Sequence, residues 1–298
     1  MIDRIEALAA LARHGTTGRA ATALRITQSA VSKRVAALES ELGRRLVERD
    51  GRRVRLTEAG ERFLAAVRAP LADLRAACDA EAAPSARALR VGVSESVLAS
   101  WGAPLLAHAC AAAGGVTPTP HAHRSPVVLD HVRAADYDLA LVAGESDAAP
   151  DLVFEPLGEE RLVVVPSARA RLTVVRGSTL RVRSIERSSA TWRSVARRLA
   201  HLRRAAGVEI VVDEVVESFA AAVALARAGF GPALVPAGIA DALGVRRPVE
   251  LPAPGLARPV ALAARRSVLA RPEVRAFADA LRRAAPRFVP GPAATRNS

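Results

Sequence analysis

The sequence has 298 residues, half of them apolar and only 3% aromatic, and it carries a formal net charge of +13 at pH 7. This length allows two or three domains with a sizeable hydrophobic core. Two cysteines are too few for a disulfide framework, and the charged residues Asp3, Arg4 and Glu6 interrupt any secretory apolar segment at the start. We therefore expect a cytoplasmic protein rather than a secreted one.

Basic residues are densest near the N-terminus, where residues 1–58 hold 12 basic and 7 acidic side chains. A basic surface of this kind supplies the salt-dependent, sequence-independent part of DNA affinity. The alternative is a bias of the whole composition, because Lys33 is the only lysine and arginine stands elsewhere. That bias accounts for most of the sequence pI of about 11.4. Only the local clustering therefore favours nucleic acid as a partner.

Three short helices are predicted at the N-terminus. Asp3 and Glu6 form a capping box at the start of the first helix, which ends near Gly15. A second helix over residues 19–24 is joined to the third by only two residues. This tight spacing is typical of a helix-turn-helix motif.

The third helix, residues 27–39, has the pattern of a DNA recognition helix. Thr27 can cap its first turn, while Val31, Val35 and Leu38 recur at helical spacing and face a core. The polar residues off this stripe suit DNA, because Gln and Ser bond base edges while Lys and Arg neutralise phosphates. They are Gln28, Ser29, Ser32, Lys33 and Arg34. Taken alone, the segment also fits an ordinary amphipathic helix with a solvated basic face.

A hairpin is predicted after these helices. Two short strands, residues 46–49 and 53–56, flank Asp50-Gly51-Arg52, and Asp-Gly is a strong hairpin signal. Such a hairpin would be the wing of a winged helix-turn-helix domain. Arg52 and Arg53 in this wing are further candidates for contacts with DNA.

A long helix is predicted from Thr57 to about Glu81. Its apolar residues are spaced by four, four, three and four positions, which is the pattern of a coiled-coil seam. They are Phe63, Val67, Leu71, Leu74 and Cys78. Pro70 removes one backbone hydrogen bond, so we expect a bend there or a displaced helix start. The alternative is a helix that packs on its own domain.

After residue 88, short apolar strands alternate with helical segments, which is typical of α/β architecture. The predicted strands are residues 89–93, 119–123, 138–142, 162–166, 208–212, 233–236 and 259–263. The predicted helices are residues 96–113, 127–134, 191–205, 218–228 and 271–285. Residues 97–120 lack charged side chains, but their glycines and prolines are too frequent for a membrane span, so no membrane association is expected.

A series of short motifs runs through the first sixty residues in a fixed order. The motifs are Ala20-Ala21, Leu24, Thr27 to Ser32, Leu38-Glu39, Leu42-Gly43, Leu46 with Arg49, and Leu56-Thr57 with Gly60. This ordered series resembles that of the LysR-type transcriptional regulators. Further matches, among them Tyr137 to Leu141 and Ala228 to Gly231, extend the resemblance over nearly the whole chain.

The resemblance implies an α/β protein with a winged helix-turn-helix domain at 1–58, a linker (dimerisation) helix at 59–87 and an effector-binding domain at 88–298. The effector-binding domain is expected to have two α/β lobes, as in periplasmic binding proteins, with lobe I at about 88–160 and 265–298 and lobe II at about 161–264. In this family the linker helix pairs two chains, so the recognition helices read a two-fold related site. The implied function is a transcription factor. A homodimer or homotetramer would bind double-stranded operator DNA, respond to a small-molecule effector between the lobes and, as an activator, contact RNA polymerase.

Candidate effector-binding residues follow from the architecture that the resemblance implies. In such two-lobed sheets a ligand lies beyond the carboxyl ends of the strands, at helix N-termini that favour anions. The polar residues at the matching positions are Ser94, Glu95, Ser96, Ser125, Ser189 and Thr191. Hydroxyls would hold a carboxylate and Glu95 would accept from an amine or hydroxyl, so we expect a small carboxylate or an amino acid. The alternative is that Ser96, Ser125, Thr191 and Ser218 only cap helices.

Other chemistry has less support in the sequence. His121 and His123 share one face of a predicted strand near His108 and Cys110, so a zinc or copper sensor is an alternative. Gly229-Phe230-Gly231 lacks the rest of a dinucleotide fingerprint, and no nucleophile elbow or phosphate-binding loop is visible. We therefore expect no enzyme activity, cofactor or metal. Two competing functions remain: a cytoplasmic solute-binding or enzymatic α/β protein whose N-terminal helices only mediate association, and a nucleoid protein that binds any duplex.

Overall fold

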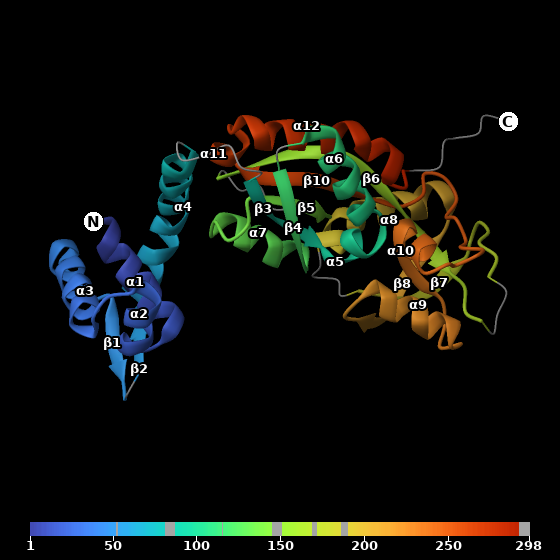
Figure 1. The fold of residues 1–298 in the computed structure, drawn as a ribbon. Helices are drawn as coiled ribbons and strands as arrows, with labels where there is room; N and C mark the ends of the chain where they lie inside the picture. The colour runs from blue at the N-terminus through green and yellow to red at the C-terminus, as the bar shows by residue number, and fades with distance from the viewer. Residues whose placement is uncertain are drawn as a thin grey trace. The chain divides into compact units, whose positions relative to one another are not determined.

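The structure is a computed structural model that describes residues 1–51, 53–80, 87–114, 116–144, 151–168, 172–185 and 190–291. The chain divides into two compact units, Met1–Pro84 and Ser85–Ser298. Figure 1 shows both units as ribbons. Each unit has its own hydrophobic core, and each is described by itself.

The first unit is a winged helix-turn-helix domain followed by a long helix. Its elements are α1 (Ile2–His14), α2 (Thr17–Leu24), α3 (Gln28–Leu42), β1 (Val47–Asp50), β2 (Arg53–Leu56) and α4 (Glu58–Ala80). Strands β1 and β2 are antiparallel, with Asp50 opposite Arg53, so the Asp-Gly signal correctly predicted the hairpin. Leu8, Val31 and Leu38 are fully buried in the core of this unit. The predicted fold of the N-terminal domain is confirmed.

Helix α4 continues through Pro70 as one helix, so the proline does not displace the helix start. Phe63, Val67 and Leu71 are partly buried against the core of the first unit. Leu74, one position further along the predicted seam, is 46% exposed. The first part of the seam therefore packs on its own domain, as the alternative interpretation expected, and pairing of two chains through this helix stays a prediction.

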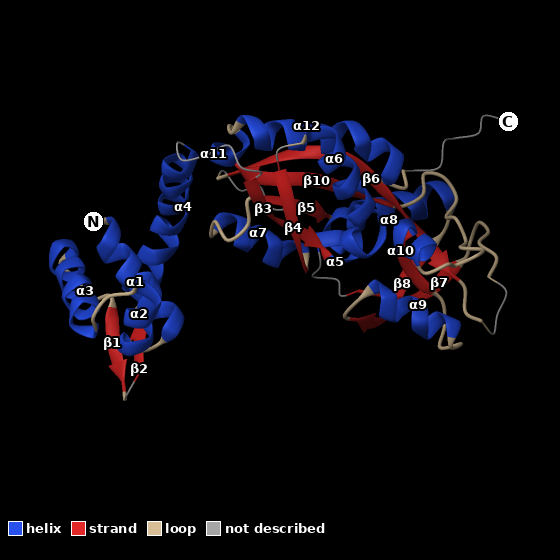
Figure 2. Cartoon of the chain, viewed as in Figure 1, coloured by secondary structure: helices blue, strands red, loops and turns tan. Residues whose placement is uncertain are grey.

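The second unit contains an eight-stranded sheet in the order β4-β3-β5-β10-β6-β9-β7-β8. The strands are β3 (Arg87–Ser94), β4 (Val116–His123), β5 (Leu139–Ala143), β6 (Leu152–Val165), β7 (Thr179–Ile185), β8 (Glu209–Val216), β9 (Ala233–Pro236) and β10 (Ala257–Arg265). The helices are α5 (Glu95–Val97), the π-helix η1 (Leu98–Gly102), α6 (Ala103–Ala113), α7 (Ser125–Arg133), α8 (Ala190–Ala206), α9 (Phe219–Arg227), α10 (Ala237–Ala242), α11 (Arg266–Leu269) and α12 (Pro272–Phe288). Figure 2 shows the strands between layers of helices.

Two long strands join the lobes of this sheet. Strand β6 pairs with β10 over its first residues and with β9 over Leu162–Val165, so it passes from the first lobe into the second. Strand β10 also lies antiparallel to β5. Residues 257–264, which the sequence analysis assigned to lobe II, therefore pair within the sheet of the first lobe.

Three parts of the second unit differ from the predicted elements. The predicted helix over 96–113 is interrupted by η1, where Gly102 approaches so closely that a Cβ would lie 2.7 Å from the Val97 carbonyl oxygen. Strand β7 and the first part of β6 were not predicted. The short helices α10 and α11 were also missed, because a few residues give too little periodicity.

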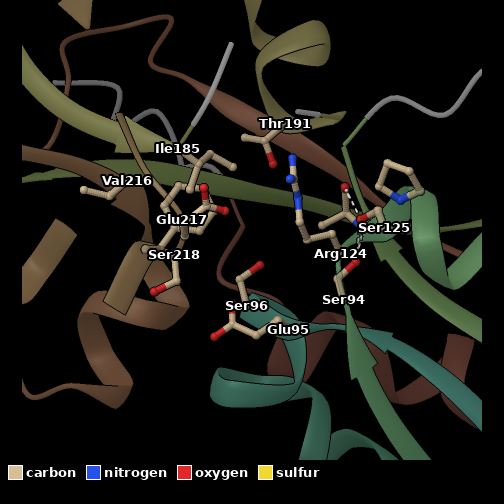
Figure 3. Close-up of a pocket in the computed structure, with 13 residues that line it drawn as sticks. Ser94, Glu95, Ser96, Arg124, Ser125, Ile185, Thr191, Val216, Glu217 and Ser218 are labelled. Carbon is tan, nitrogen blue, oxygen red and sulfur yellow. Dashed lines mark hydrogen bonds between the residues drawn. The ribbon is translucent and has the colours of Figure 1, made fainter. Parts of the chain in front are cut away.

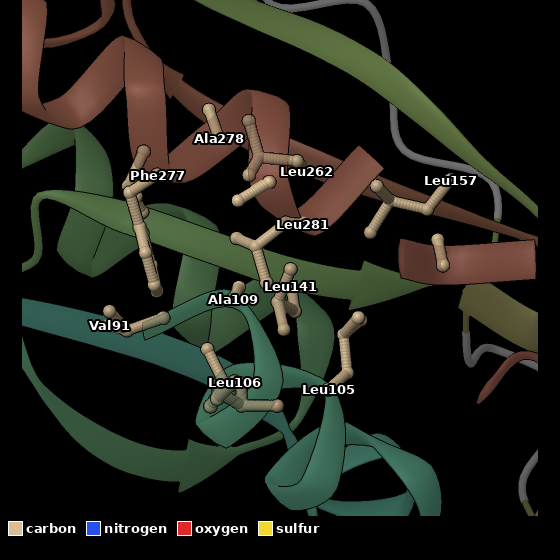
Figure 4. Close-up of a cluster of buried hydrophobic side chains, with 14 of the residues drawn as sticks. Val91, Leu105, Leu106, Ala109, Leu141, Leu157, Leu262, Phe277, Ala278 and Leu281 are labelled. Carbon is tan, nitrogen blue, oxygen red and sulfur yellow. The ribbon is translucent and has the colours of Figure 1, made fainter. Parts of the chain in front are cut away.

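The core of the first lobe lies between the sheet and the pair of helices α6 and α12 (Figure 4). Leu105 and Leu106 of α6 pack with Phe277 and Leu281 of α12 in this core. One described stretch, Glu95–Ala113, is long and apolar enough to cross a membrane by length and composition alone. A core helix passes the same test, and 39% of this stretch's most apolar window is buried within the unit.

Candidate functional site

Helix α3 presents a polar face next to its buried face. The Thr27 hydroxyl accepts from the Ala30 amide at 3.2 Å and caps the helix. Burial of Val31, Val35 and Leu38 then fixes the rotation of the helix on the core. Four of the predicted contact residues are exposed as a result: Gln28, Ser29, Ser32 and Lys33. Gly18 of α2 leaves room for the Gln28 side chain, because a Cβ at position 18 would lie 3.3 Å from the side-chain nitrogen Nε2 of Gln28.

The structure separates Arg34 from the other predicted DNA contacts. Its guanidinium lies 3.2 Å from the Asp3 carboxylate on α1 and is only 33% exposed. Arg53 is exposed at the start of β2, in the wing. Arg52, the other predicted contact of the wing, lies outside the described residues. The hydrogen-bonding groups and positive charge on the exposed face of α3 and on the wing therefore come from residues other than Arg34.

Glu39 connects α3 to the wing, which the sequence analysis did not predict. Its Oε1 accepts from the amides of Leu46 at 2.7 Å and Val47 at 3.1 Å. Thr57 supports the same loop from the other side, since its hydroxyl donates to the Arg45 carbonyl at 2.8 Å. No local signal pointed to these bonds, because the end of α3 at Leu42-Gly43 leaves carbonyl groups rather than amides without intrahelical partners.

Gly60, the last residue of the Leu56-Thr57 and Gly60 motif, allows α4 to pass close to the wing. A Cβ at this position would lie 2.1 Å from the Leu46 carbonyl oxygen, so a larger residue would push α4 away from the wing. The Gly60 amide donates to the Thr57 hydroxyl, which caps α4. The spacing of Leu56-Thr57 and Gly60 therefore sets how the wing meets the long helix.

The second unit contains a pocket of about 70 Å³ between its two lobes (Figure 3). It lies at the carboxyl ends of β3, β4 and β5 of the first lobe and of β7 and β8 of the second. The lining residues are Ser94, Glu95, Ser96, Arg124, Ser125, Pro126, Ala143, Ile185, Thr191, Val216, Glu217, Ser218 and Phe219. Five of the six predicted effector-binding residues thus come together here, and Ser189 lies outside the described residues.

Ser94 and Ser125 form one wall of the pocket. Their hydroxyl oxygens lie 2.5 Å apart, and the Ser125 hydroxyl donates to the Ala143 carbonyl at 2.9 Å. The Ala143 amide donates back to both oxygens, at 3.2 Å to Ser94 and 3.3 Å to Ser125. These bonds join the ends of three parallel strands or the helices that follow them, and they hold this wall rigid.

Ser96 and Thr191 also line the pocket and share a buried partner, Arg258. The guanidinium donates to the Ser96 hydroxyl at 3.0 Å and to the Thr191 hydroxyl at 3.2 Å. Ser96 follows β3 of the first lobe, whereas Thr191 belongs to α8 of the second. A single side chain therefore bonds both lobes just behind the pocket.

Arg258 itself is paired with Glu160, and both side chains are almost completely buried. The guanidinium donates to Glu160 Oε2 from Nε at 3.0 Å and from Nη2 at 2.7 Å. The other carboxylate oxygen accepts from the Trp101 indole at 3.0 Å and from the Gly238 amide at 3.2 Å. Because buried charges require such pairing, this network is well satisfied. Sequence analysis missed it, since the partners lie 98 positions apart.

Helix capping does not explain most of the pocket hydroxyls. Ser218 does cap a helix, since its hydroxyl accepts from the Ala221 amide at 3.2 Å. In contrast, Ser96 and Thr191 bond Arg258, and Ser125 bonds the end of β5. Two carboxylates, Glu95 and Glu217, are exposed at the edge of the pocket. Sequence analysis missed Glu217, although it directly follows a strand.

The histidines of the alternative metal site are dispersed. His121 stacks on Tyr137 with ring centroids 5.1 Å apart, and His123 lies 6.2 Å from the same ring. The His108 ring instead lies beside that of Phe288, with ring centroids 5.6 Å apart. Burial, helped by the charge of Asp136, raises the pKa of the Tyr137 phenol above its usual value. Among the described residues, no three His, Cys, Asp or Glu side chains come together as metal ligands.

Comparisons with known proteins identify both parts of the chain. The model of the bacterial regulatory helix-turn-helix protein, lysR family, matches residues 2–61, and that of the LysR substrate binding domain matches residues 82–286. An uncharacterised HTH-type transcriptional regulator of Vibrio cholerae is 28% identical over 99% of this chain and 100% of its own length.

Two solved structures show the same fold. Full-length OxyR from Pseudomonas aeruginosa has a TM-score of 0.70 at 22% identity, over 95% of this chain and 97% of that chain. Full-length LysG from Corynebacterium glutamicum, solved with bound effector Arg, has a TM-score of 0.64 at 22% identity, over 97% of this chain and 99% of that chain.

Proposed function

Because the chain belongs to the LysR family of DNA-binding transcriptional regulators, we propose that α3 and the wing bind operator DNA and that the interlobe pocket binds a small carboxylate or amino acid. The observation that carries the second part is the pocket lining. Hydroxyls, two carboxylates and the Arg124 guanidinium, from segments at the ends of β3, β4, β7 and β8, meet in one cavity between two lobes. A ligand held there contacts both lobes, so it stabilises one arrangement of them over another.

On the DNA side, Gln28, Ser29 and Ser32 are proposed to contact base edges, because their side chains donate and accept and are exposed on one face of α3. Lys33 and Arg53 are proposed to neutralise phosphates. Arg34 is assigned a structural part instead, since Asp3 already pairs with it. Arg52, which follows Gly51 in the sequence, stays a proposed phosphate contact.

On the effector side, hydroxyl groups favour the carboxylate of a ligand, and the carboxylates Glu95 and Glu217 favour a cationic or amine group. This combination suits an amino acid better than a simple acid. LysG, which shares the fold, was solved with bound effector Arg, and such a ligand carries both kinds of group. We therefore rank amino acids first and other small carboxylates second.

A two-fold assembly completes the proposal. The exposed Leu74 lies on α4 beyond the part of the helix that packs on its own core, so it is available to a second copy of the chain. Two paired recognition helices would read two half-sites. Effector binding would then change operator affinity by the difference in its affinity for the two assemblies. A regulator that activates would also contact RNA polymerase.

The DNA interface can be tested with amine acetylation, because Lys33 is the only lysine in the chain. We expect a duplex from the region upstream of the gene to protect Lys33 from acetylation, and a scrambled duplex of equal length to protect it less. Mass spectrometry measures the modified fraction, with the N-terminal amine as an internal control. Equal protection by both duplexes would instead indicate a nucleoid protein, and no protection by either would remove α3 from the interface.

The effector can be identified by thermal shift, since a ligand that binds the folded state raises the apparent stability. Amino acids, small aliphatic acids and aromatic acids form the panel. We expect a stabilising amino acid whose effect disappears in Ser94→Ala and Ser125→Ala. Ser267→Ala serves as the control, because this residue is absent from the pocket lining. No stabilisation by any member of the panel would contradict the proposed ligand class.

A further inference from the structure

We propose that Arg258 is a positioning residue of the pocket: fixed by Glu160, it turns the hydroxyls of Ser96 and Thr191, one from each lobe, into hydrogen-bond donors for the carboxylate of the ligand. The inference rests on the proposed function of the pocket and names what selects the ligand there. It assigns no direct ligand contact to Arg258, which is absent from the pocket lining.

The position of Arg258 is set by the strands that join the lobes. Arg258 on β10 and Glu160 on β6 are directly opposite in the antiparallel register, so their side chains lie on the same face of the sheet. The carboxylate receives two bonds from the guanidinium and one each from Trp101 and Gly238. Gly238 is required there, because a Cβ would lie 2.8 Å from Glu160 Oε1. The fork of the guanidinium is therefore held at a fixed place.

The direction of the hydrogen bonds follows from chemistry. A guanidinium has five N–H donors and no acceptor, so both Ser96 and Thr191 must accept from Arg258. Each hydroxyl hydrogen then needs another acceptor. Both residues line the pocket, and no bond of these hydroxyls to another acceptor is found among the described residues. Both hydroxyls are thus left to donate to a ligand.

The Ser94 and Ser125 hydroxyls of the pocket behave differently. The Ser125 hydroxyl donates to the Ala143 carbonyl, so the short contact with Ser94 requires Ser94 to donate to Ser125. Both hydroxyl hydrogens on this wall are already used, and only lone pairs face a ligand. We call Ser96 and Thr191 the donor side of the pocket and Ser94 and Ser125 its acceptor side; the Arg124 guanidinium, a further donor, also lines the pocket. An amino acid, with a carboxylate and an ammonium group, matches this polarity.

The donor side also depends on the arrangement of the lobes. Ser96 belongs to the first lobe and Thr191 to the second, so both hydroxyls reach Arg258 only when the lobes are placed as observed. Phe219 of the second lobe lies over the guanidinium, with Cζ 5.4 Å from the ring centroid, and screens it from water. A carboxylate that bonds both hydroxyls stabilises this same arrangement.

The two tryptophans of the chain make the test specific. Trp101 donates to Glu160, and Trp192 follows Thr191 and donates to the Ile185 carbonyl at 2.6 Å. In a proton–nitrogen NMR spectrum, the indole N–H signal of Trp101 therefore reports on Glu160, and that of Trp192 reports on the surroundings of Thr191. Their shifts give dissociation constants for three pairs of probes that differ only in the carboxylate: L-arginine and its amide, L-alanine and its amide, and benzoate and benzamide.

In Arg258→Lys, the ammonium group keeps the charge beside Glu160 but cannot hold two hydroxyls and a carboxylate in one plane. We expect the dissociation constant of the binding carboxylate to rise about tenfold, while that of its amide changes by less than about twofold. A merely structural role would weaken both probes equally. Arg265→Lys is the matched control, because Arg265 is also buried on β10 but donates to the carbonyls of Val132 and Tyr137.

A second variant guards against misfolding. The double variant Glu160→Met/Arg258→Met removes both charges of the buried pair and therefore leaves no unpaired buried charge. We expect this double variant to fold and to lose the preference for carboxylate over amide. If either variant keeps the wild-type ratio of the two dissociation constants within about twofold, the role of Arg258 is overturned but the proposed ligand class is not. A wild-type protein that responds to none of the three carboxylates would overturn the proposed ligand class, and this inference with it.

Discussion

The two units of the chain differ in their ion pairs, because among the described residues only the second unit has a fully buried one. In the first unit, ion pairs such as Arg4 with Glu41 lie at the surface, 2.7 Å apart and about 40% exposed on both sides. In the second unit, Glu160 and Arg258 are paired in the interior. Exposed pairs contribute at most about 1 kcal/mol, whereas breaking a buried pair costs about 3–5 kcal/mol. The first unit therefore keeps its charge available for a polyanion, and the second uses charge to hold its own lobes.

The largest effect is expected for Glu160→Ala. This change leaves Arg258 charged and buried, so the free energy of unfolding of the second unit should fall by about 3–5 kcal/mol. Urea denaturation followed by fluorescence measures it, since Trp101 and Trp192 both lie in this unit. Glu250→Ala is the control, because Glu250 is half exposed in its pair with Arg161 and should cost less than about 1 kcal/mol. Equal losses in the two variants would contradict the contrast between a buried and an exposed ion pair.

A backbone contact gives the next largest effect, in the first unit. Gly60→Ala places a Cβ against the Leu46 carbonyl, and the rearrangement should cost up to about 3 kcal/mol. Calorimetry should show a lower transition temperature for the first unit alone. Gly18→Ala is a matched change in α2, where the new Cβ meets only the flexible Gln28 side chain. A Gly60→Ala protein as stable as the wild type would mean that the wing and α4 can separate freely.

Glu39 should have a smaller effect, because its bonds are only partly buried. Glu39→Ala removes the acceptor of the Leu46 and Val47 amides and should destabilise the wing by about 2 kcal/mol. Glu39→Gln keeps a carbonyl oxygen and should recover about half of that loss. Hydrogen exchange of the two amides measures the change locally. Unchanged protection in Glu39→Ala would show that the wing is held by its strands alone.

The smallest effect concerns pH. Burial raises the pKa of the Tyr137 phenol above 10.0, so the neutral form is favoured in the folded state. This contribution is complete below pH 10 and is lost as the pH rises through the raised pKa, so the stability should fall in that range. Tyr137→Phe should remove this part of the alkaline slope. Urea midpoints measured from about pH 9 to about pH 11 test it, and identical slopes in both proteins would contradict it.

The sequence predicts the first unit well because its signals are local. Thr27 caps α3 three residues before its partner amide, and Asp50-Gly51 makes the hairpin between neighbouring strands. The predicted strand ends likewise brought Ser94 and Ser125 to the pocket. In each case the partners are close in sequence, or a general rule for parallel sheets places them together.

Non-local pairing explains what the sequence did not predict. The first part of β6 contains Pro156 and Gly158, two residues that are unfavourable inside a strand. It forms a strand nevertheless, because β10 pairs with it from Leu152 to Arg161. Strand β7 alternates apolar residues with arginines, which hid it in an arginine-rich chain. Arg258 meets Glu160 only through the register of β6 and β10, and no local pattern encodes a register between strands so far apart.

The place of β10 in the sheet also bears on the order in which the protein folds during synthesis. Strand β10 lies between β5 and β6, but the ribosome completes it only after all of residues 161–256. The second lobe can therefore form its sheet first, while the first lobe waits for the strand between β5 and β6 and for α12. Such long-range pairing is slow, so the nascent first lobe exposes the edges of β5 and β6 in the meantime.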